Sequence, residues 1–146
     1  IVTGYNADIA ERFGDRNRQL IKTYGQKLFG ISISDSQDNK TQWDLKNHKG
    51  GLYATGLNGS LTSNNGALII VDDPIKNEVE ANNPSVREQI WANFSTSLMT
   101  RQQGKGNDII IIQKAEIALH DASIGRTIDK ITNMLEIRLI STDYLE

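Results

Sequence analysis

Two uninterrupted apolar runs dominate the hydrophobic pattern of this chain. Residues 67–71 contain five apolar side chains in a row, and residues 109–112 are four isoleucines. Short runs without a polar break predict strands that are covered on both faces. A helical pattern lies between the two runs, and the order strand, helix, strand predicts a right-handed crossover that joins two parallel strands.

The helix between these runs has the clearest local signature. Asn83 suits the N-cap, and Pro84 suits the first helical position, where its missing N–H costs nothing. Apolar residues then recur every four positions from Val86 to Leu98. The pattern predicts a helix over residues 84–101 whose stripe belongs to the core rather than to a base-stacking surface.

A second helix is predicted over residues 7–24, after a short strand at residues 1–5. Asn6 suits its N-cap, and Gly25 is placed to end it in a left-handed conformation. The apolar residues near one face of this helix are Ile9, Phe13, Leu20, Ile21 and Tyr24. We expect its basic residues to form a solvated face, with contact to DNA as the alternative: Arg12, Arg16, Arg18 and Lys22.

The remaining elements are shorter. Residues 42–45 and 52–57 flank a glycine-containing turn and predict a hairpin beside the main sheet, with His48 exposed in the turn. Residues 113–135 allow a helix broken near Gly125, and residues 136–140 allow a last strand.

Length and composition limit the class of protein. A chain of 146 residues with 38% hydrophobic and 23% charged residues suits one globular domain. It has no cysteine, no signal-peptide pattern and no apolar run near the roughly 20 residues that span a bilayer, so we expect a cytoplasmic location. The net charge of -2 gives no global basic field that would indicate a nucleic-acid partner. The chain begins with Ile1 rather than Met, so we expect a piece of a longer protein or a processed form.

Two adjacent carboxylates, Asp72 and Asp73, follow the run at residues 67–71 and precede Pro74. Ligands of open α/β sheets bind beyond the carboxyl ends of the strands. An apolar strand that ends in two acids is what a Walker B segment requires, since the first acid holds Mg²⁺ and the second polarises the attacking water. The alternative, of similar weight, is a buried strand that runs into a simple Asp-Asp-Pro turn.

The glycine-rich residues 56–66 do not supply a phosphate loop. Such a loop needs Gly, four residues, and then Gly-Lys-Ser/Thr at the start of a helix. The Gly-Lys pair of this chain, Gly104-Lys105, is followed by Gly106, and Met99 stands at the place of the first glycine. The sequence therefore combines a candidate metal site with no nucleotide cradle of its own.

Taken together, these motifs resemble the large terminase subunit of tailed bacteriophages, in the ATPase part of the DNA-packaging motor. The likeness covers about residues 1–112 and is most specific at Asp72-Asp73-Pro74-Ile75-Lys76. The stretches that carry it as a set are residues 5–13, 50–62, 67–76, 86–91 and 98–101.

The resemblance implies an α/β fold with a mainly parallel sheet flanked by helices, a partial P-loop NTPase fold with a β-hairpin. It implies one domain over residues 1–146, corresponding to the C-terminal half of a terminase-like ATPase domain. It also implies ATP hydrolysis with Mg²⁺, with Asp72 in the metal-binding role and Asp73 in the water-activating role. The implied partners are double-stranded DNA, the small terminase subunit, the portal and further copies of the chain, with no membrane, in the host cytoplasm of a phage or prophage.

Departures from the family pattern bear on activity. The Walker A segment and the nuclease domain of the family are missing from this sequence. Ser63-Asn64-Asn65-Gly66 stands where the family usually has Gly-Arg-Gly or a similar string, and Gln113-Lys114-Ala115-Glu116 replaces the coupling segment Thr-Arg-Trp-His-Glu. We therefore predict little or no ATPase activity from the chain alone.

Two alternatives remain open at this point. The chain could be a non-enzymatic scaffold or interaction module that keeps the motor fold. It could also be a Mg²⁺-dependent phosphoesterase or nuclease, but two-metal chemistry would then need a further acid beside Asp72 and Asp73. Asp35, Asp108 and Glu116 are the candidates for that acid.

Overall fold

The computed structural model describes residues 1–59, 61, 64–101 and 108–112 of the chain. A mixed six-stranded sheet forms its centre, in the strand order β2-β3-β4-β1-β5-β6. The strands are β1 (Val2–Gly4), β2 (Ile33–Asp38), β3 (Gln42–Leu45), β4 (Gly51–Gly56), β5 (Leu68–Asp72) and β6 (Asp108–Ile112). The pairings β4–β1, β1–β5 and β5–β6 are parallel, whereas β2–β3 and β3–β4 are antiparallel. The expected α/β class, with a mainly parallel sheet flanked by helices, is confirmed.

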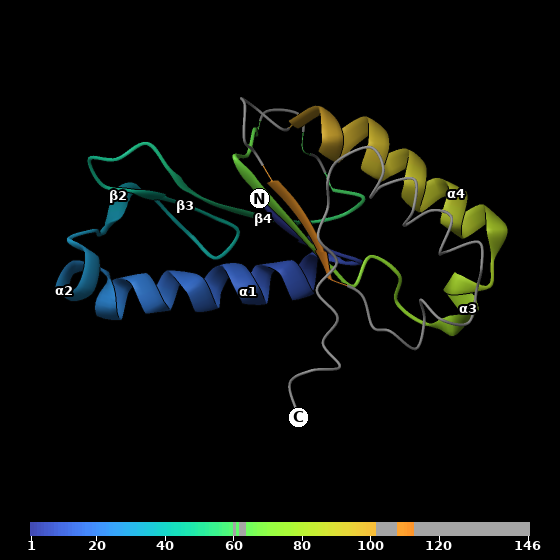
Figure 1. The fold of residues 1–146 in the computed structure, drawn as a ribbon. Coiled ribbons are helices and arrows are strands. Elements are labelled where there is room, and N and C mark those ends of the chain that lie inside the picture. The colour runs from blue at the N-terminus through green and yellow to red at the C-terminus, as the bar shows by residue number, and fades with distance from the viewer. Residues whose placement is uncertain (60, 62–63, 102–107, 113–146) are drawn as a thin grey trace.

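Helices α1 (Ala7–Leu20) and α4 (Pro84–Asn93) lie on opposite faces of this sheet, as Figure 1 shows. The topology explains why. The chain passes through α1 on its way from β1 to β4, and through α4 on its way from β5 to β6, and these two paths leave the β1–β5 pair in opposite directions. Because parallel crossovers are right-handed, the two helices must cover different faces. The predicted parallel pairing of the two apolar runs is also confirmed, with Ile69 opposite Ile109 and Val71 opposite Ile111.

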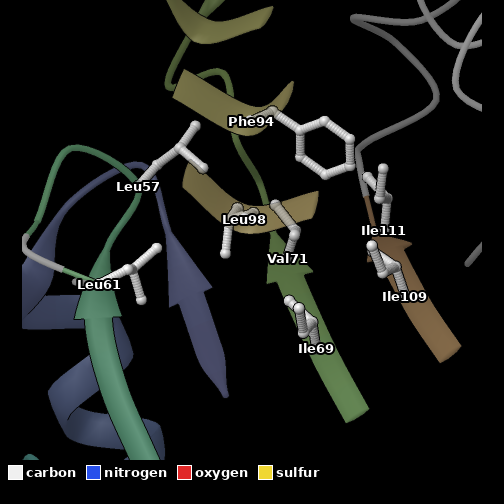
Figure 2. Packing of buried hydrophobic residues seen from close by; sticks show 8 residues of the cluster. All are labelled: Leu57, Leu61, Ile69, Val71, Phe94, Leu98, Ile109 and Ile111. Carbon is white, nitrogen blue, oxygen red and sulfur yellow. The ribbon is translucent and has the colours of Figure 1, made fainter. Parts of the chain in front are cut away.

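The main core lies between the sheet and the helical residues 94–98 that continue α4 (Figure 2). Alternate residues of β5 and β6 point into it and meet Phe94 and Leu98. Phe94–Leu98 is a π-helical continuation of α4, named η2, and a 3-10 turn, η3 (Met99–Arg101), follows it. The predicted helix over residues 84–101 is therefore confirmed, and its core stripe is confirmed at Phe94 and Leu98, with Ile90 partly buried against them. Val86 borders the edge of the sheet where the parallel strands end, instead of the core. The buried cluster comprises Leu57, Leu61, Ile69, Val71, Phe94, Leu98, Ile109 and Ile111.

The prediction that the two apolar strands are covered on both faces is wrong. Ile69 is fully buried, but Leu68 is 43% exposed, and Ile70 and Ile110 are only partly buried. The reason is the position of α1, which packs on β4 and β1. Helix α1 therefore buries Ala54 of β4, but it covers β5 and β6 less completely on the same face of the sheet.

Helix α1 extends further than the sequence predicts. The chain stays helical through η1 (Ile21–Gly25), a π-helical turn, and α2 (Gln26–Phe29). The left-handed residue at the end is Gly30, with φ of 67°, so the assignment of this role to Gly25 is wrong. Gly25 is needed for space instead, because a Cβ at this position would lie 2.8 Å from the carbonyl oxygen of Ile31 as the chain turns back.

The face that α1 buries also differs from the expected one. Ala10 and Gly14 are buried against the sheet, whereas Phe13, Leu20 and Tyr24 are exposed. A Cβ at Gly14 would lie 2.5 Å from the carbonyl oxygen of Lys40, so only glycine allows the helix this close to the hairpin. The approach also lets the Nε1 of the buried Trp43 donate a hydrogen bond of 3.1 Å to the carbonyl oxygen of Gly14.

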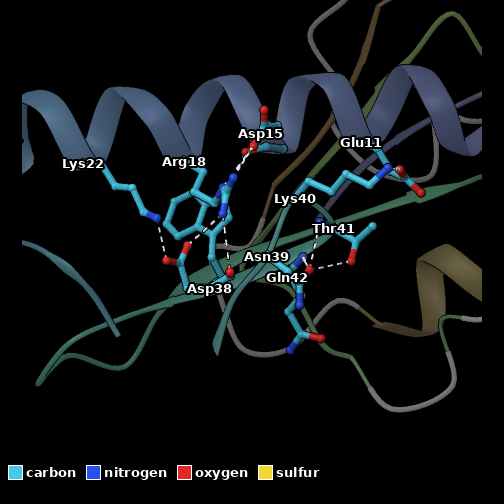
Figure 3. Close-up of polar contacts among 11 residues, drawn as sticks. Glu11, Asp15, Arg18, Lys22, Asp38, Asn39, Lys40, Thr41 and Gln42 are labelled. Carbon is cyan, nitrogen blue, oxygen red and sulfur yellow. Dashed lines mark hydrogen bonds and ion pairs between the residues drawn. The ribbon is translucent and has the colours of Figure 1, made fainter. Parts of the chain in front are cut away.

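Ion pairs fix the other flank of α1 to the end of β2 and the turn that follows it (Figure 3). Arg18 pairs with Asp15 at 2.7 Å and with Asp38 at 3.0 Å, and Lys22 also pairs with Asp38. Lys40, in the turn between β2 and β3, pairs with Glu11 of α1. The expected solvated face therefore holds for Arg12, Arg16 and Lys22, which are exposed, although Lys22 also pairs with Asp38. It is wrong for Arg18, whose side chain is largely covered where it binds Asp38.

The predicted hairpin is present as β3 and β4, with Trp43 opposite Leu52 and His48 exposed in its turn. It does not lie beside the main sheet, because β4 also pairs with β1 and so continues that sheet. Strand β2 and the short helix α3 (Glu78–Ala81) were not predicted. The elements expected over residues 113–146 lie outside the described part of the chain. Within the described part, no helix combines the length and apolar character needed to cross a membrane.

Candidate metal site at the rim of the sheet

The carboxyl ends of the four parallel strands meet at one edge of the sheet, which we call the rim. In register, Gly4 of β1 lies beside Gly56 of β4 and beside Asp72 of β5, and Asp72 lies beside Ile112 of β6. A Cβ at Gly4 would lie 3.0 Å from the carbonyl oxygen of Asp72, so glycine permits this close strand packing. The structure therefore places Asp72, with Asp73 next to it, at the end of the sheet where α/β proteins bind ligands.

Asp72 is the last residue of β5 and is partly buried. Strand alternation puts its side chain on the same face as Ile70, which is the face that carries α1. Burial raises the pKa of the Asp72 carboxyl above its ordinary value, and the neighbouring charge of Asp73 raises this pKa further. An anion that is both desolvated and repelled by a second anion is stabilised by a bound cation.

Asp73 has a left-handed backbone, with φ of 42°. Its amide donates a hydrogen bond of 2.8 Å to the carbonyl oxygen of Ile112. The chain thus keeps its tie to β6 for one residue beyond β5 and then turns towards Pro74. Aspartate tolerates the left-handed region better than most residues do, because its short side chain can hydrogen-bond locally. The local conformation therefore turns the backbone away from β5 at the second acid.

A small hollow of about 150 Å³ lies at the rim, next to Pro74. It is bordered by Tyr5 after β1, by Asn58 after β4, and by Glu80 and Gln89 of α3 and α4. Small-molecule sites usually measure about 300–1,000 Å³, so this hollow is too small for a whole nucleotide. Sequence reasoning missed these four polar side chains, although Tyr5 and Asn58 could have been inferred from their place just after parallel strands.

Lys76 lies near this hollow, where it contacts Tyr5 and Glu80. Its ammonium nitrogen is 5.9 Å from the centre of the Tyr5 ring, in a cation–π arrangement. Its backbone amide donates a hydrogen bond of 3.2 Å to the Glu80 carboxylate. The segment after the two acids is therefore tied back to α3 and to the end of β1.

Another hollow, larger at about 740 Å³, lies at the opposite edge of the sheet. Its lining includes Ile1, His48, Gly66 and Leu68, near the starts of the strands, and neither Asp72 nor Asp73 borders it. Size and chemistry thus point to different edges. Asp72 and Asp73 do not border the smaller hollow either, but they lie at the same edge, where adjacent carboxylates, a raised pKa and converging strand ends come together.

The described acids proposed as third ligands do not join Asp72 and Asp73. Asp35 lies on β2 and pairs with Lys46 at 3.0 Å. Asp108 begins β6 opposite Leu68, at the far end of the strand from Asp72. Glu116 lies outside the described residues. Among the residues that the structure does describe, no group of three or more histidines and acids is placed to hold a metal ion.

Asp72 is the described acid whose surroundings best suit a Mg²⁺ ligand, because it is partly buried at the rim and its pKa is raised. This ion keeps several water ligands and is commonly bound by one or two carboxylates together with the phosphates of a substrate. One carboxylate such as Asp72 is enough for the protein's part of such a shared site. The described residues do not fit ATP. The rim hollow is too small for a nucleotide, and the sequence has no phosphate loop that would enclose the phosphates.

The fold and the rim together define an α/β protein with two adjacent carboxylates at the carboxyl edge of a mostly parallel sheet. Comparison with protein-family models and with curated proteins finds no match to the chain.

Proposed function

We propose that this chain is the Mg²⁺-binding half of a terminase-like ATPase domain, with a P-loop NTPase fold that is completed from outside these 146 residues. The observation that supports the proposal most directly is the position of Asp72 and Asp73, at the carboxyl end of a strand with parallel neighbours on both sides. By resemblance, the activity is ATP hydrolysis coupled to packaging of double-stranded viral DNA, with the small terminase subunit and the portal as partners.

The chemistry assigned to the site is in-line attack of water on the γ-phosphate of ATP. When bound, Mg²⁺ would neutralise charge on the phosphate oxygens. Asp72 would hold the ion, which offsets the cost of keeping this partly buried carboxylate charged. Asp73, whose backbone turns away from β5, would orient and polarise the attacking water. The amide donors and the lysine that surround phosphates in such enzymes must come from another segment.

Metal binding and turnover test the proposal separately. We expect Mg²⁺ to raise the unfolding temperature of the chain, because a ligand that binds only the folded state stabilises it. Asp72→Asn should remove this shift, and Asp108→Asn, an acid at the other end of the neighbouring strand, should keep it. We expect no turnover of Mg·ATP by the purified chain. Robust ATP hydrolysis that is lost in Asp73→Asn would contradict the incomplete site, and a Mg²⁺ shift that survives Asp72→Asn would contradict the metal assignment.

A non-enzymatic interaction module is the second candidate. The observation that favours it is the exposure of large apolar side chains along the first helical segment, away from the rim. A pull-down of the chain with other motor subunits separates the two functions. Association that requires Mg·ATP supports the nucleotide site, whereas association that is indifferent to nucleotide supports the scaffold.

A further inference from the structure

An exposed apolar stripe runs along the helical segment from α1 to α2. Its members Phe13, Leu20, Tyr24 and Leu28 are 39%, 49%, 51% and 61% exposed, and Phe29 at its end is 70% exposed. Steps of seven, four and four residues keep side chains near one side of a helix. At about 1.5 Å per residue, the stripe is roughly 23 Å long. A contiguous row of large apolar side chains in water is typical of a surface that binds a partner.

The rotation of the helix is fixed by contacts on its other sides, so the stripe cannot turn into the core. Ala10 and the tightly packed Gly14 hold the sheet-facing side of α1. The ion pairs of Glu11 with Lys40, and of Arg18 with Asp38, hold the side that faces β2 and the turn after it (Figure 3). The stripe lies on the side that these contacts leave uncovered.

The charges beside the stripe have one sign. Arg12, Arg16 and Lys27 are exposed, and none of them forms an ion pair with a described residue. The acids between Ile9 and Phe29 are Glu11 and Asp15, and both are engaged on the opposite flank. A partner that covers the stripe therefore meets positive charge along its border.

We infer that this stripe is a docking surface for an amphipathic helix of another protein that carries acidic residues beside its apolar side. A groove or stripe of this spacing matches the way one helix lies against another. A second copy of the chain is disfavoured, because parallel or antiparallel pairing of two such stripes brings Arg12 and Arg16 against basic residues. A bilayer is disfavoured because the stripe is a single row of side chains, whereas a membrane-surface helix buries a broad apolar face. Basic residues such as Arg16 would also suit anionic lipid, so the test includes anionic vesicles. The inference does not depend on the proposed ATPase function.

Peptide binding to the full chain tests the inference. The probe is a fluorescent helical peptide of about 18 residues, with leucines along one side and glutamates beside them, long enough to cover the stripe. A second probe has lysines in place of the glutamates. We expect the acidic probe to bind and the basic probe not to bind, as measured by fluorescence anisotropy. Leu20→Ser should weaken binding of the acidic probe about tenfold, because central apolar side chains dominate such interfaces. Arg16→Glu should weaken the acidic probe and strengthen the basic one.

Val79→Ser is the matched control, since Val79 is 79% exposed but lies on α3. It should leave both affinities unchanged, and circular dichroism should show that every variant is folded. The inference is overturned if neither probe binds, or if Val79→Ser weakens binding as much as Leu20→Ser does. It is also overturned if Leu20→Ser abolishes a dimer seen by sedimentation, or if anionic lipid vesicles bind through Leu20 while the peptides do not.

Discussion

The backbone amide of Asp73 donates a hydrogen bond of 2.8 Å to the carbonyl oxygen of Ile112, although the φ of Asp73 is 42°. This bond joins the ends of β5 and β6 just past the last paired residues, Asp72 and Ile112. It holds the second of the two acids at the rim in a conformation that most residues avoid. The geometry of the candidate metal site is thus coupled to the pairing of the two strands that form the main core.

The left-handed conformation of Asp73 has a measurable energetic consequence. Asp73→Gly and Asp73→Val both delete the carboxylate, but only valine must place a branched side chain at positive φ. We expect the valine variant to be less stable than the glycine variant by about 1–2 kcal/mol. Urea unfolding of the two variants measures the difference. Equal stabilities would show that the turn after β5 does not constrain this residue.

The raised pKa of Asp72 sets the pH dependence of its stability contribution. An acid whose pKa is higher in the folded state binds more protons there, so the free energy of unfolding falls as the pH rises from the ordinary pKa through the raised one. We therefore expect Asp72→Asn to be more stable than the parent chain at neutral pH and to lose this advantage as the pH falls below the ordinary pKa of aspartate. Urea midpoints of both proteins between about pH 3.5 and 8 measure it. An advantage that is constant with pH would place its cause outside the titration of Asp72.

Asp38 should show the opposite sign. Its pKa is lowered, chiefly by the hydrogen bond from Lys22 and also by the one from Arg18. Its contribution to stability is therefore present above the ordinary pKa of aspartate and is lost as the pH falls through the lowered value. We expect Asp38→Asn to be less stable than the parent chain at neutral pH, with the difference vanishing in acid. High salt should reduce the difference, because the pairs are partly exposed.

The contact of α1 with the hairpin depends on the missing side chain of Gly14. Alanine normally favours a helix by about 1 kcal/mol over glycine. At this position its Cβ would lie 2.5 Å from the carbonyl oxygen of Lys40 and 3.0 Å from the Cβ of Ala54. We expect Gly14→Ala to destabilise the chain by about 1–3 kcal/mol, as overpacking does. Chemical unfolding and the fluorescence of Trp43 report the change, and an alanine variant that is more stable than the parent would contradict the close packing.

Much of the fold follows from local pattern, and the errors have identifiable causes. Asn83-Pro84 and four-residue spacing located α4, and the two apolar runs located β5 and β6, because these signals arise from the backbone and from burial on one face. The buried face of α1 was mispredicted since α1 packs through Ala10 and Gly14 and leaves its large apolar residues outside. Periodicity reveals where apolar side chains gather but not whether another element covers them.

The candidate site was likewise predicted only in part. Because the two acids directly follow an apolar run, the sequence predicted that Asp72 and Asp73 lie at the rim. The parallel pairing of β5 with β1 and β6 confirms this position. The positive φ of Asp73 and the neighbouring hollow with Asn58 and Glu80 could not be predicted, because both depend on how separate loops and helices converge. The functional roles of the two acids remain a proposal based on resemblance and on this placement.

Localising a paramagnetic ion tests the central claim most directly. Mn²⁺ replaces Mg²⁺ at oxygen sites and broadens the NMR signals of nearby amides. We predict that substoichiometric Mn²⁺ broadens the amides of Asp72, Asp73 and Ile112 first, that Asp72→Asn removes this broadening, and that Asp108→Asn leaves it in place. Broadening centred on other residues, or broadening at the rim that persists in Asp72→Asn, would contradict a divalent-cation site formed by the paired acids.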